Sequence, residues 1–252
     1  MPGIHPNPSS WSPGALVTRG IGKAIGKALA MRCERPYLYI TTRERNRGIL
    51  EEKEVNLYRE LRALGVTPGG IWYNYMNLLD QKSIRRIADR IGTRHERLDF
   101  LVNNAGEYKK PPALLDQESL SLWEKQVKGT VRTIYDGTKN VTDTFLPLMG
   151  DDARIINMTS HLSADIDIPG FDLSSYHDPS LKLAVLDDFM EHYIRSFKDL
   201  ETFRKLGLTD CAYSITKFAT NLYTEILQED LIAQGRGISV NAICPDAPCT
   251  PR

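Results

Sequence analysis

The sequence has no excess of either charge, no long apolar run and no closely spaced cysteines, and each absence excludes a class of protein. Lysine plus arginine and aspartate plus glutamate each number 32, and this zero net charge argues against an obligate binder of nucleic acid or anionic membranes. No apolar run approaches the ~20 residues of a membrane-spanning helix. The four cysteines lack Cys-x-x-Cys spacing and a histidine cluster, so we expect no metal site.

The remaining composition is that of a globular chain, with 41% hydrophobic and 25% charged residues. Residues 1–13 contain four prolines and no apolar segment, which predicts a flexible leader rather than a signal or transit peptide. We expect residues 14–252 to form a single domain in the cytoplasm, with no membrane and no nucleic-acid partner.

Six short, mostly apolar runs alternate with segments of helical spacing. Strands covered on both faces are nearly continuous in apolar residues, and intervening helices imply right-handed βαβ crossovers. The pattern therefore predicts an α/β fold with a Rossmann-type, doubly wound parallel sheet of six strands, whose ligands bind beyond the carboxyl ends of the strands. The candidate strands are Ala15–Thr18, Tyr37–Thr41, Ile71–Met76, Leu98–Val102, Arg154–Met158 and Ile238–Cys244.

Apolar spacing predicts the helices between these strands. The connection before Tyr213 is far longer than usual, and its helical spacing predicts a folded helical insertion over about residues 163–210. The expected helices are one that Gly65 ends, one that Asp80 caps, a long stretch from about Ser119 towards Pro147, and Leu186–Leu206.

A glycine-containing turn follows the first strand, at Arg19-Gly20-Ile21-Gly22. Glycine lets a backbone approach a pyrophosphate closely, and the amino terminus of a helix supplies N–H donors. This position favours a nucleotide site, although the same residues are also compatible with a plain strand-to-helix turn.

Two more polar turns follow strands. The tetrapeptide Asn103-Asn104-Ala105-Gly106 comes after the fourth strand, where it can contact a ribose or adenine edge or simply form a turn. Ser160 comes just after the fifth strand, where it can donate to a substrate or cap a helix.

Tyr213 and Lys217 are spaced i, i+4, which places both on one face of a helix. An ammonium beside a phenol favours the phenolate and lowers the tyrosine pKa from ~10, as acid–base chemistry near neutral pH requires. The alternative is a common surface pair of tyrosine and lysine.

The order of these features along the chain resembles the short-chain dehydrogenase/reductase family, over roughly residues 15–250. Three further features resemble its carbonyl reductase branch, namely Thr42-Arg43-Glu44, Phe145-Leu146-Pro147-Leu148 and the insertion before Tyr213.

The resemblance implies that Tyr213 donates a proton to a substrate carbonyl. Lys217 would lower its pKa and hold the nicotinamide ribose, and Ser160 would hydrogen-bond the carbonyl oxygen. Asn77 takes the place of an aspartate that usually contacts adenine. The implied cofactor-binding residues are Arg19, Gly20, Ile21, Gly22, Arg43, Asn77, Asn103, Asn104, Ala105, Gly106, Tyr213 and Lys217.

Charge favours NADP(H) as the cofactor. Arg19 and Arg43 match positions where NADP-preferring members of the family carry a base, and a guanidinium pairs bidentately with a 2′-phosphate. An acidic residue after the second strand would instead have indicated NAD.

The alternative for this arginine-rich segment is a solvated charged face. In that interpretation Arg43, Arg45 and Arg47 pair with Glu44 and Glu51 and bind no phosphate.

The chain departs from the family pattern in three places. The family turn reads Thr-Gly-x-x-x-Gly-x-Gly, but here Arg19-Gly20 follows Thr18 at once, so the first glycine is missing. Counted back from Pro147, Ile134 stands where the family often keeps a catalytic asparagine. After Cys244-Pro245-Asp246 we expect no seventh strand.

We therefore expect an NADPH-dependent oxidoreductase that acts on a small ketone or aldehyde, or on the corresponding alcohol. A similar insertion in relatives covers a dimer face, which is compatible with a monomer. The three departures favour an alternative, a catalytically impaired Rossmann-like protein that binds a nucleotide or a partner.

Overall fold

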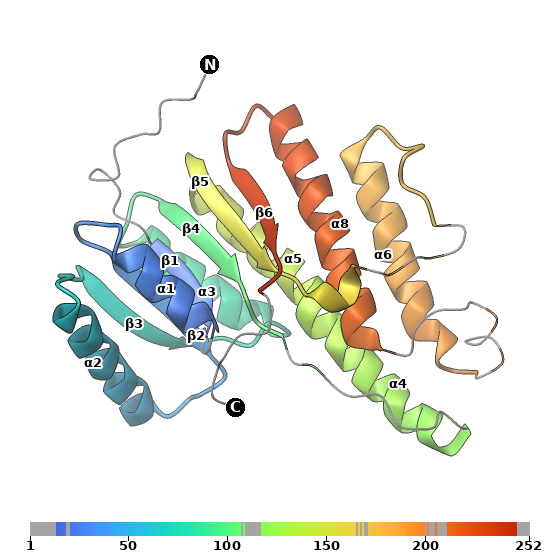
Figure 1. The fold of residues 1–252 in the computed structure, drawn as a ribbon, viewed down its shortest axis with the longest axis horizontal. Helices are drawn as coiled ribbons and strands as arrows, with labels where there is room; N and C mark the ends of the chain where they lie inside the picture. The colour runs from blue at the N-terminus through green and yellow to red at the C-terminus, as the bar shows by residue number, and fades with distance from the viewer. Residues whose placement is uncertain are drawn as a thin grey trace. The chain divides into compact units, whose positions relative to one another are not determined.

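The strands of the computed structural model form one six-stranded sheet in the order β3-β2-β1-β4-β5-β6 (Figure 1). The pairs β1–β2, β1–β4 and β2–β3 are parallel. Chain order reverses between β1 and β4, as in a doubly wound sheet. The strands are β1 (Gly14–Thr18), β2 (Tyr37–Thr42), β3 (Gly70–Tyr75), β4 (Leu98–Asn103), β5 (Met149–Met158) and β6 (Ser239–Ile243).

The structure describes residues 14–18, 21–106, 108, 117–164, 166, 168, 171–199, 201, 205 and 211–245. They divide into two compact units, which we describe separately. Unit 1 takes those within Met1–Asn104 and Asn140–Ile156, and unit 2 takes those within Ala105–Lys139 and Asn157–Asp246.

Unit 1 holds β1 to β4 and the helices α1 (Ile21–Ala30), α2 (Arg47–Ala63) and α3 (Gln81–Gly92). Its core is apolar on both sides of the strands, which explains their nearly unbroken apolar sequence. The core cluster includes Leu38, Ile40, Ile71 and Tyr73 of the strands and Leu50, Leu57 and Leu61 of α2.

Local signals set the ends of α2 and α3. Asn46 caps α2 by accepting from the N–H groups of the first turn, and Gly65, at φ +80°, ends it with the left-handed backbone that glycine adopts readily. Asp80 caps α3 in the same way, which confirms the sequence prediction.

Unit 2 contains the long helical stretch expected from about Ser119 towards Pro147, but it is not one uniform α-helix. It runs as α4 (Gln117–Val131), the π-helical turn η2 (Arg132–Asp136), α5 (Gly137–Phe145), which continues into unit 1, and the 3₁₀ turn η3 (Leu146–Leu148). In η2 the N–H of Gly137 donates to the carbonyl of Arg132, five residues earlier.

The expected insertion contains the helix α6 (Pro179–Ser196), which packs beside α8 (Ala212–Ala233) within unit 2 (Figure 1). Met190, Ile194 and Phe197 are buried, as their spacing predicts. The helix begins earlier than the expected Leu186 because Asp178 caps it and Pro179 occupies its first turn. Phe203 lies outside the described residues.

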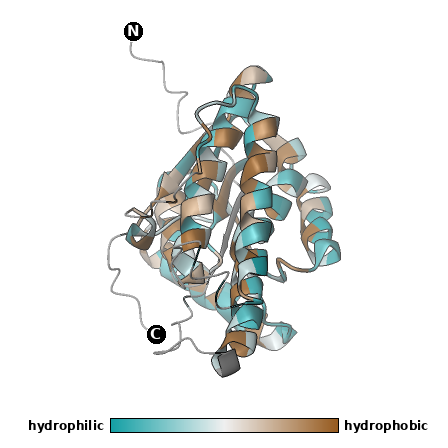
Figure 2. Ribbon diagram, turned by 90° about the vertical axis from the view of Figure 1, so that its right-hand side faces the viewer, coloured by the Kyte–Doolittle hydropathy of each residue, from teal (hydrophilic) through white to brown (hydrophobic). Residues whose placement is uncertain are grey.

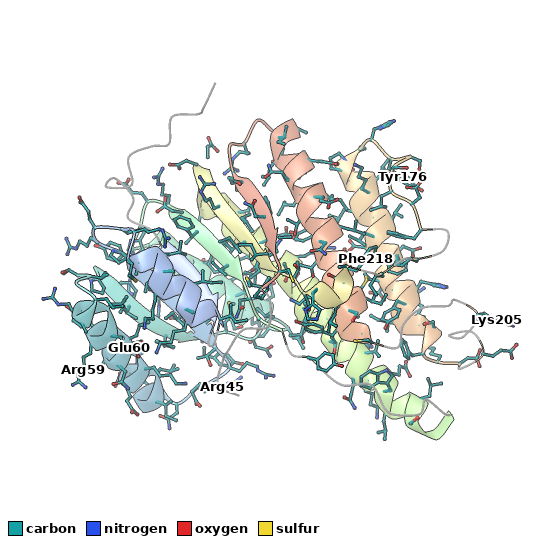
Figure 3. All side chains as sticks on the ribbon, viewed as in Figure 1. Arg45, Arg59, Glu60, Tyr176, Lys205 and Phe218 are labelled. Carbon is teal, nitrogen blue, oxygen red and sulfur yellow. The ribbon has the colours of Figure 1, made fainter. Side chains whose placement is uncertain are left out.

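Phe171, Phe189 and Phe218 attach the insertion to α8. The Phe171 ring lies 4.7 Å from that of Phe189 and 6.4 Å from that of Phe218, between ring centroids. Phe218 is labelled on α8 in Figure 3. The helices alternate hydrophobic and hydrophilic stretches around the coil, as expected when each buries one side (Figure 2).

All six strands differ from their predicted bounds at one or both ends, by a single residue except in β5. The fifth strand begins at Met149 rather than Arg154, and its early polar residues include Asp152, which pairs with Arg97 at 3.0 Å. This strand thus extends beyond its apolar run. β1 begins at Gly14 rather than Ala15, β2 ends at Thr42 rather than Thr41, and β4 ends at Asn103 rather than Val102. β3 is Gly70–Tyr75 rather than Ile71–Met76, and β6 is Ser239–Ile243 rather than Ile238–Cys244. None of the helices in the described ranges combines the length and apolar character that crossing a bilayer requires.

Candidate active site

The first turns of α8 present Tyr213 and Lys217 in one neighbourhood. The Lys217 amine lies 5.5 Å from the centroid of the Tyr213 ring, close enough for a cation–π contact. The i, i+4 spacing therefore does place the two side chains together, and the alternative of an unrelated surface pair is wrong because Lys217 is only 3% exposed.

Lys217 is a buried amine with an identified acceptor. Its Nζ donates to the backbone carbonyl of Met158, the last residue of β5, at 2.5 Å. Burial disfavours the ammonium and lowers the pKa of Lys217 from its ordinary 10.5 to about 8. The side chain is therefore mostly protonated at neutral pH and loses its charge in mildly alkaline solution.

The phenol of Tyr213 responds mainly to burial, which raises its pKa above the ordinary value of 10. A hydrogen bond with Ser160 acts in the opposite direction and favours the phenolate. The net direction differs from the lowering that the spacing to Lys217 predicts, since the lysine amine is turned to Met158. Tyr213 is thus a protonated donor near neutral pH.

Ser160 combines the two roles that its sequence position left open. It is the residue before the short 3₁₀ turn η4 (His161–Ser163), and its Oγ accepts from the Leu162 N–H at 3.3 Å. The same side chain hydrogen-bonds Tyr213. A helix cap here also orients a hydroxyl beside the phenol.

Gly106 and Ile134 lie next to the lysine amine. A Cβ added at Gly106 would lie 3.4 Å from Ile134 Cδ1 and 3.6 Å from Lys217 Nζ. Ile134 is buried in the middle of η2. The position expected for a catalytic asparagine is therefore beside Lys217, and it carries a side chain that makes no hydrogen bond.

Several neighbours of Tyr213 were missed by the sequence analysis. The ring of Tyr108 contacts that of Tyr213 edge to face, with 5.6 Å between centroids, and Tyr108 is 51% exposed. Cys244 and Cys211 lie close enough to raise the pKa of Tyr213 electrostatically. None of these residues stands at a regular spacing from Tyr213, so only the fold brings them together.

The cofactor-binding residues predicted in unit 1 follow its strands. Ile21 and Gly22 begin α1, Arg43 is exposed just after β2, and Asn77 follows β3. Asn77 Oδ1 accepts from the Leu79 N–H at 3.1 Å, so its side chain shapes the local turn. Arg19 and Gly20 lie outside the described residues.

Asn103 is the last residue of β4, and Asn104 and Ala105 follow it, at the sheet's change of chain order. Asn103 Nδ2 donates to Thr142 Oγ1 of α5 at 3.0 Å, which fixes this turn within unit 1. Because the carboxyl ends of β1 and β4 are neighbours, this is the edge of unit 1 where a doubly wound sheet binds a ligand.

The charged face proposed for residues 43–51 exists in part. Arg47 pairs with Glu51 at 2.8 Å and with Glu54 at 3.2 Å. Arg45 instead stacks on the Tyr75 ring, with 4.3 Å from Cζ to the centroid, and donates to its hydroxyl at 2.6 Å. Arg43 is exposed, and no pair with Glu44 or Glu51 involves it in this part of the structure.

A doubly wound parallel sheet together with adjacent serine, tyrosine and lysine side chains defines a Rossmann-type oxidoreductase. The chain belongs to the short-chain dehydrogenase family, whose model, described as "short chain dehydrogenase", matches residues 15–176. Among the described residues, no group of three or more His, Cys, Asp or Glu side chains is arranged to hold a metal ion.

Characterised relatives cover nearly the whole chain. Carbonyl reductase [NADPH] 3 of Rattus norvegicus is 28% identical over 250 residues, which cover 94% of this chain and 82% of the relative. Short-chain dehydrogenase/reductase 1 of Saponaria officinalis is 26% identical, covering 92% and 80%. These similarities support the carbonyl reductase-like branch.

A solved structure shows the same fold. Menthone neomenthol reductase from Mentha piperita superimposes with a TM-score of 0.69 at 24% identity, covering 94% of this chain and 90% of that structure.

Proposed function

We propose that this protein is an NADPH-dependent reductase that converts a ketone or aldehyde to an alcohol, or catalyses the reverse reaction, with Tyr213 as the proton donor. The observation that carries the proposal is the position of the buried Lys217 amine, 5.5 Å from the centroid of the Tyr213 ring, with Ser160 acting on the same phenol. The relatives named carbonyl reductase [NADPH] support the same chemistry and cofactor.

Each of the two units carries residues suited to one part of a dinucleotide. The first-turn N–H groups of α1, at Ile21 and Gly22, have no acceptor within their own helix and suit a phosphate. The exposed guanidinium of Arg43 suits a 2′-phosphate. Gly106 has no side chain. A Cβ atom at this position would already be in van der Waals contact with Lys217 Nζ, so the space beside the amine is open to a ribose only because residue 106 is glycine.

Each residue has one task in this proposal. The bound cofactor supplies the hydride, and the protein supplies orientation and the proton. Ser160 and Tyr213 donate hydrogen bonds to the carbonyl oxygen, and Tyr213 passes its proton as negative charge develops there. In this proposal the Lys217 ammonium turns from the Met158 carbonyl to the phenolate that remains and stabilises it, since Nζ lies 5.5 Å from the centroid of the Tyr213 ring.

The test is Tyr213→Phe, assayed with NADPH and a panel of uncharged ketones and aldehydes. We expect kcat to fall by about 10²- to 10⁴-fold, the usual range for losing a general acid, while binding of NADPH persists. Tyr58→Phe, on the outer side of α2, is the matched control and keeps full activity. Undiminished turnover in Tyr213→Phe would reject the mechanism.

The second candidate is a protein that binds a nucleotide without efficient turnover. It is favoured by the buried Ile134 near the amine of Lys217, because an isoleucine side chain has no polar group to relay a proton. Tryptophan fluorescence distinguishes the two candidates. Saturable NADPH binding without turnover of any substrate in the panel supports the second candidate, whereas binding with turnover supports the reductase.

A further inference from the structure

One face of α8 holds the end of β5 and the segment after it at three points. Tyr213, Lys217 and Asn221 follow one another at i, i+4 and i+8, which keeps them on the same side of the helix. Tyr213 bonds the side chain of Ser160, and Lys217 bonds the carbonyl of Met158. The third point involves Asn221, to which the sequence pattern assigns no role.

Asn221 reaches Ser160 through a second serine. Its Nδ2 donates to Ser163 Oγ at 3.1 Å, and Ser163 Oγ in turn donates to the backbone carbonyl of Ser160 at 2.6 Å. Ser163 is buried, and its own N–H also donates to that carbonyl at 3.0 Å. The Ser160 carbonyl therefore receives two hydrogen bonds from one residue.

These bonds fix the direction of the Ser160 side chain. Because a peptide unit is planar, holding the Ser160 carbonyl fixes the peptide plane that follows it. The Leu162 N–H, farther along the same turn, holds Ser160 Oγ at 3.3 Å. With the carbonyl and the hydroxyl both restrained, the hydroxyl keeps one orientation towards Tyr213.

An asparagine within a helix needs a reason, because its side chain competes with the helical backbone and its helix propensity is below that of alanine. Two threonines on this part of α8 are satisfied within the helix, since Thr216 and Thr220 donate to the carbonyls four residues earlier. Asn221 differs from them and resembles Lys217, because it donates to a residue outside the helix.

We propose that Asn221 is a positioning residue for Ser160, acting through Ser163, in the reaction proposed above. The Asn221–Ser163–Ser160 chain aligns the serine hydroxyl with the Tyr213 phenol, so that both reach one carbonyl oxygen. This inference rests on the proposed function for its kinetic consequence, but the alignment itself does not depend on turnover.

The kinetic test compares Asn221→Ala and Ser163→Ala with the wild type. We expect each to lower kcat by about 10- to 100-fold, the scale for a misaligned catalytic group, and to leave the KM for NADPH unchanged. Ser163→Thr keeps the hydroxyl and restores most of the rate. Gln228→Ala is the matched control on α8, since it removes bonds to Ile238 and Val240 in and beside β6 and should keep kcat.

Double variants separate positioning from a general structural role. In a Ser160→Ala background the hydroxyl to be aligned is absent, so Asn221→Ala should lower kcat no further. Likewise, Asn221→Ala with Ser163→Ala should be no slower than the slower single variant. An undiminished effect of Asn221→Ala in the Ser160→Ala background would overturn the proposal.

A readout without turnover keeps the two proposals apart. The hydrogen bond from Ser160 lowers the pKa of Tyr213, so NMR titration of ¹³C-labelled tyrosine should show a higher Tyr213 pKa in Ser160→Ala and, by the same amount, in Asn221→Ala. If the wild type has no activity, the proposed function fails, and this titration alone then decides whether Asn221 positions Ser160. An unchanged Tyr213 titration in folded Asn221→Ala, or in Asn221→Gln if the alanine variant does not fold, would reject the positioning role.

Discussion

Helices α3 and α8 bury their side chains in different ways. The difference distinguishes a helix that contributes to stability from a helix that carries the candidate catalytic side chains. α3 buries one stripe, made of Ser83, Ile84, Ile87, Ala88 and Ile91, and exposes most of the rest. α8 buries twelve of its 22 residues, distributed around much of its circumference.

The buried residues of α8 include Ser214, Thr216, Lys217, Thr220 and Thr224. Burying polar groups is unfavourable unless each has a partner, and here the threonines bond carbonyls of their own helix. Thr224 also accepts from the buried Asn157 at 2.9 Å. A helix selected for packing alone would carry apolar residues at these positions, so the polar interior of α8 is compatible with the catalytic role that we propose for its first turns.

The largest effect should come from Lys217→Met on α8. We expect a fall in kcat of roughly 10²-fold or more, because the phenolate that forms at Tyr213 in the proposed reaction would lose the positive charge proposed to stabilise it. Lys82→Met, on the exposed side of α3, is the matched control and should keep kcat. Equal rates in the two variants would remove the distinction between the helices.

The same variant should also change how stability depends on pH. The Lys217 pKa is about 8 in the folded protein and 10.5 when unfolded, so the unfolded state binds more protons between these values. Wild-type stability relative to Lys217→Met therefore rises from pH 8 to pH 10.5, by about 3 kcal/mol, and is lowest below pH 8. Urea unfolding at several pH values measures it, and a flat difference would show that the amine is not desolvated.

Ile87→Ala on α3 should lower stability and leave chemistry alone. The side chain is buried, and removing it from a packed core costs about 2–5 kcal/mol. Activity per folded molecule should match the wild type, because α3 contributes no residue of the Ser160, Tyr213 and Lys217 group. Denaturant unfolding and kcat measured on the same preparation check both statements, with the exposed Arg85→Ala as the control.

The smallest effect should come from the cap of α3. Asp80 accepts from the N–H groups of Lys82 at 3.1 Å and Ser83 at 3.4 Å, and removing a cap of this kind costs about 1 kcal/mol. Asp80→Ala should show this loss in thermal unfolding, whereas Asp80→Asn, which retains an acceptor, should lose less. Similar losses in both would mean that the charge rather than the acceptor is important.

The sequence predicts α3 well because all of its signals are local. Asp80 is a cap, and Ile84, Ile87, Ala88 and Ile91 repeat at helical spacing, so the burial follows without knowledge of the fold. It misses the start of α6 only because the cap Asp178 and the first-turn Pro179 precede the apolar repeat.

The candidate site is predictable only in part. Tyr213 and Lys217 meet because their spacing is helical. In contrast, Met158 bonds Lys217, which is 59 residues away in the chain, and Asn221 bonds Ser163, which is 58 residues away. The direction of the Tyr213 pKa was also beyond the sequence, since it depends on how deeply the ring is buried. Contacts of this kind have no periodic signature.

The π turn η2 has a further consequence for how this chain tolerates change. Five residues fill a turn in which α geometry would place fewer, so the helix before it and the helix after it are out of phase. Deleting a single residue from 132–136 would remove the extra residue of the wide turn and return the stretch to one continuous α-helix, with the later side chains keeping their direction around the axis. The same deletion within α4 or α5, where no wide turn absorbs it, would swing every later side chain by about 100°, the angle between successive α-helical residues. We therefore expect a one-codon loss to be tolerated better in η2 than in the helices on either side of it.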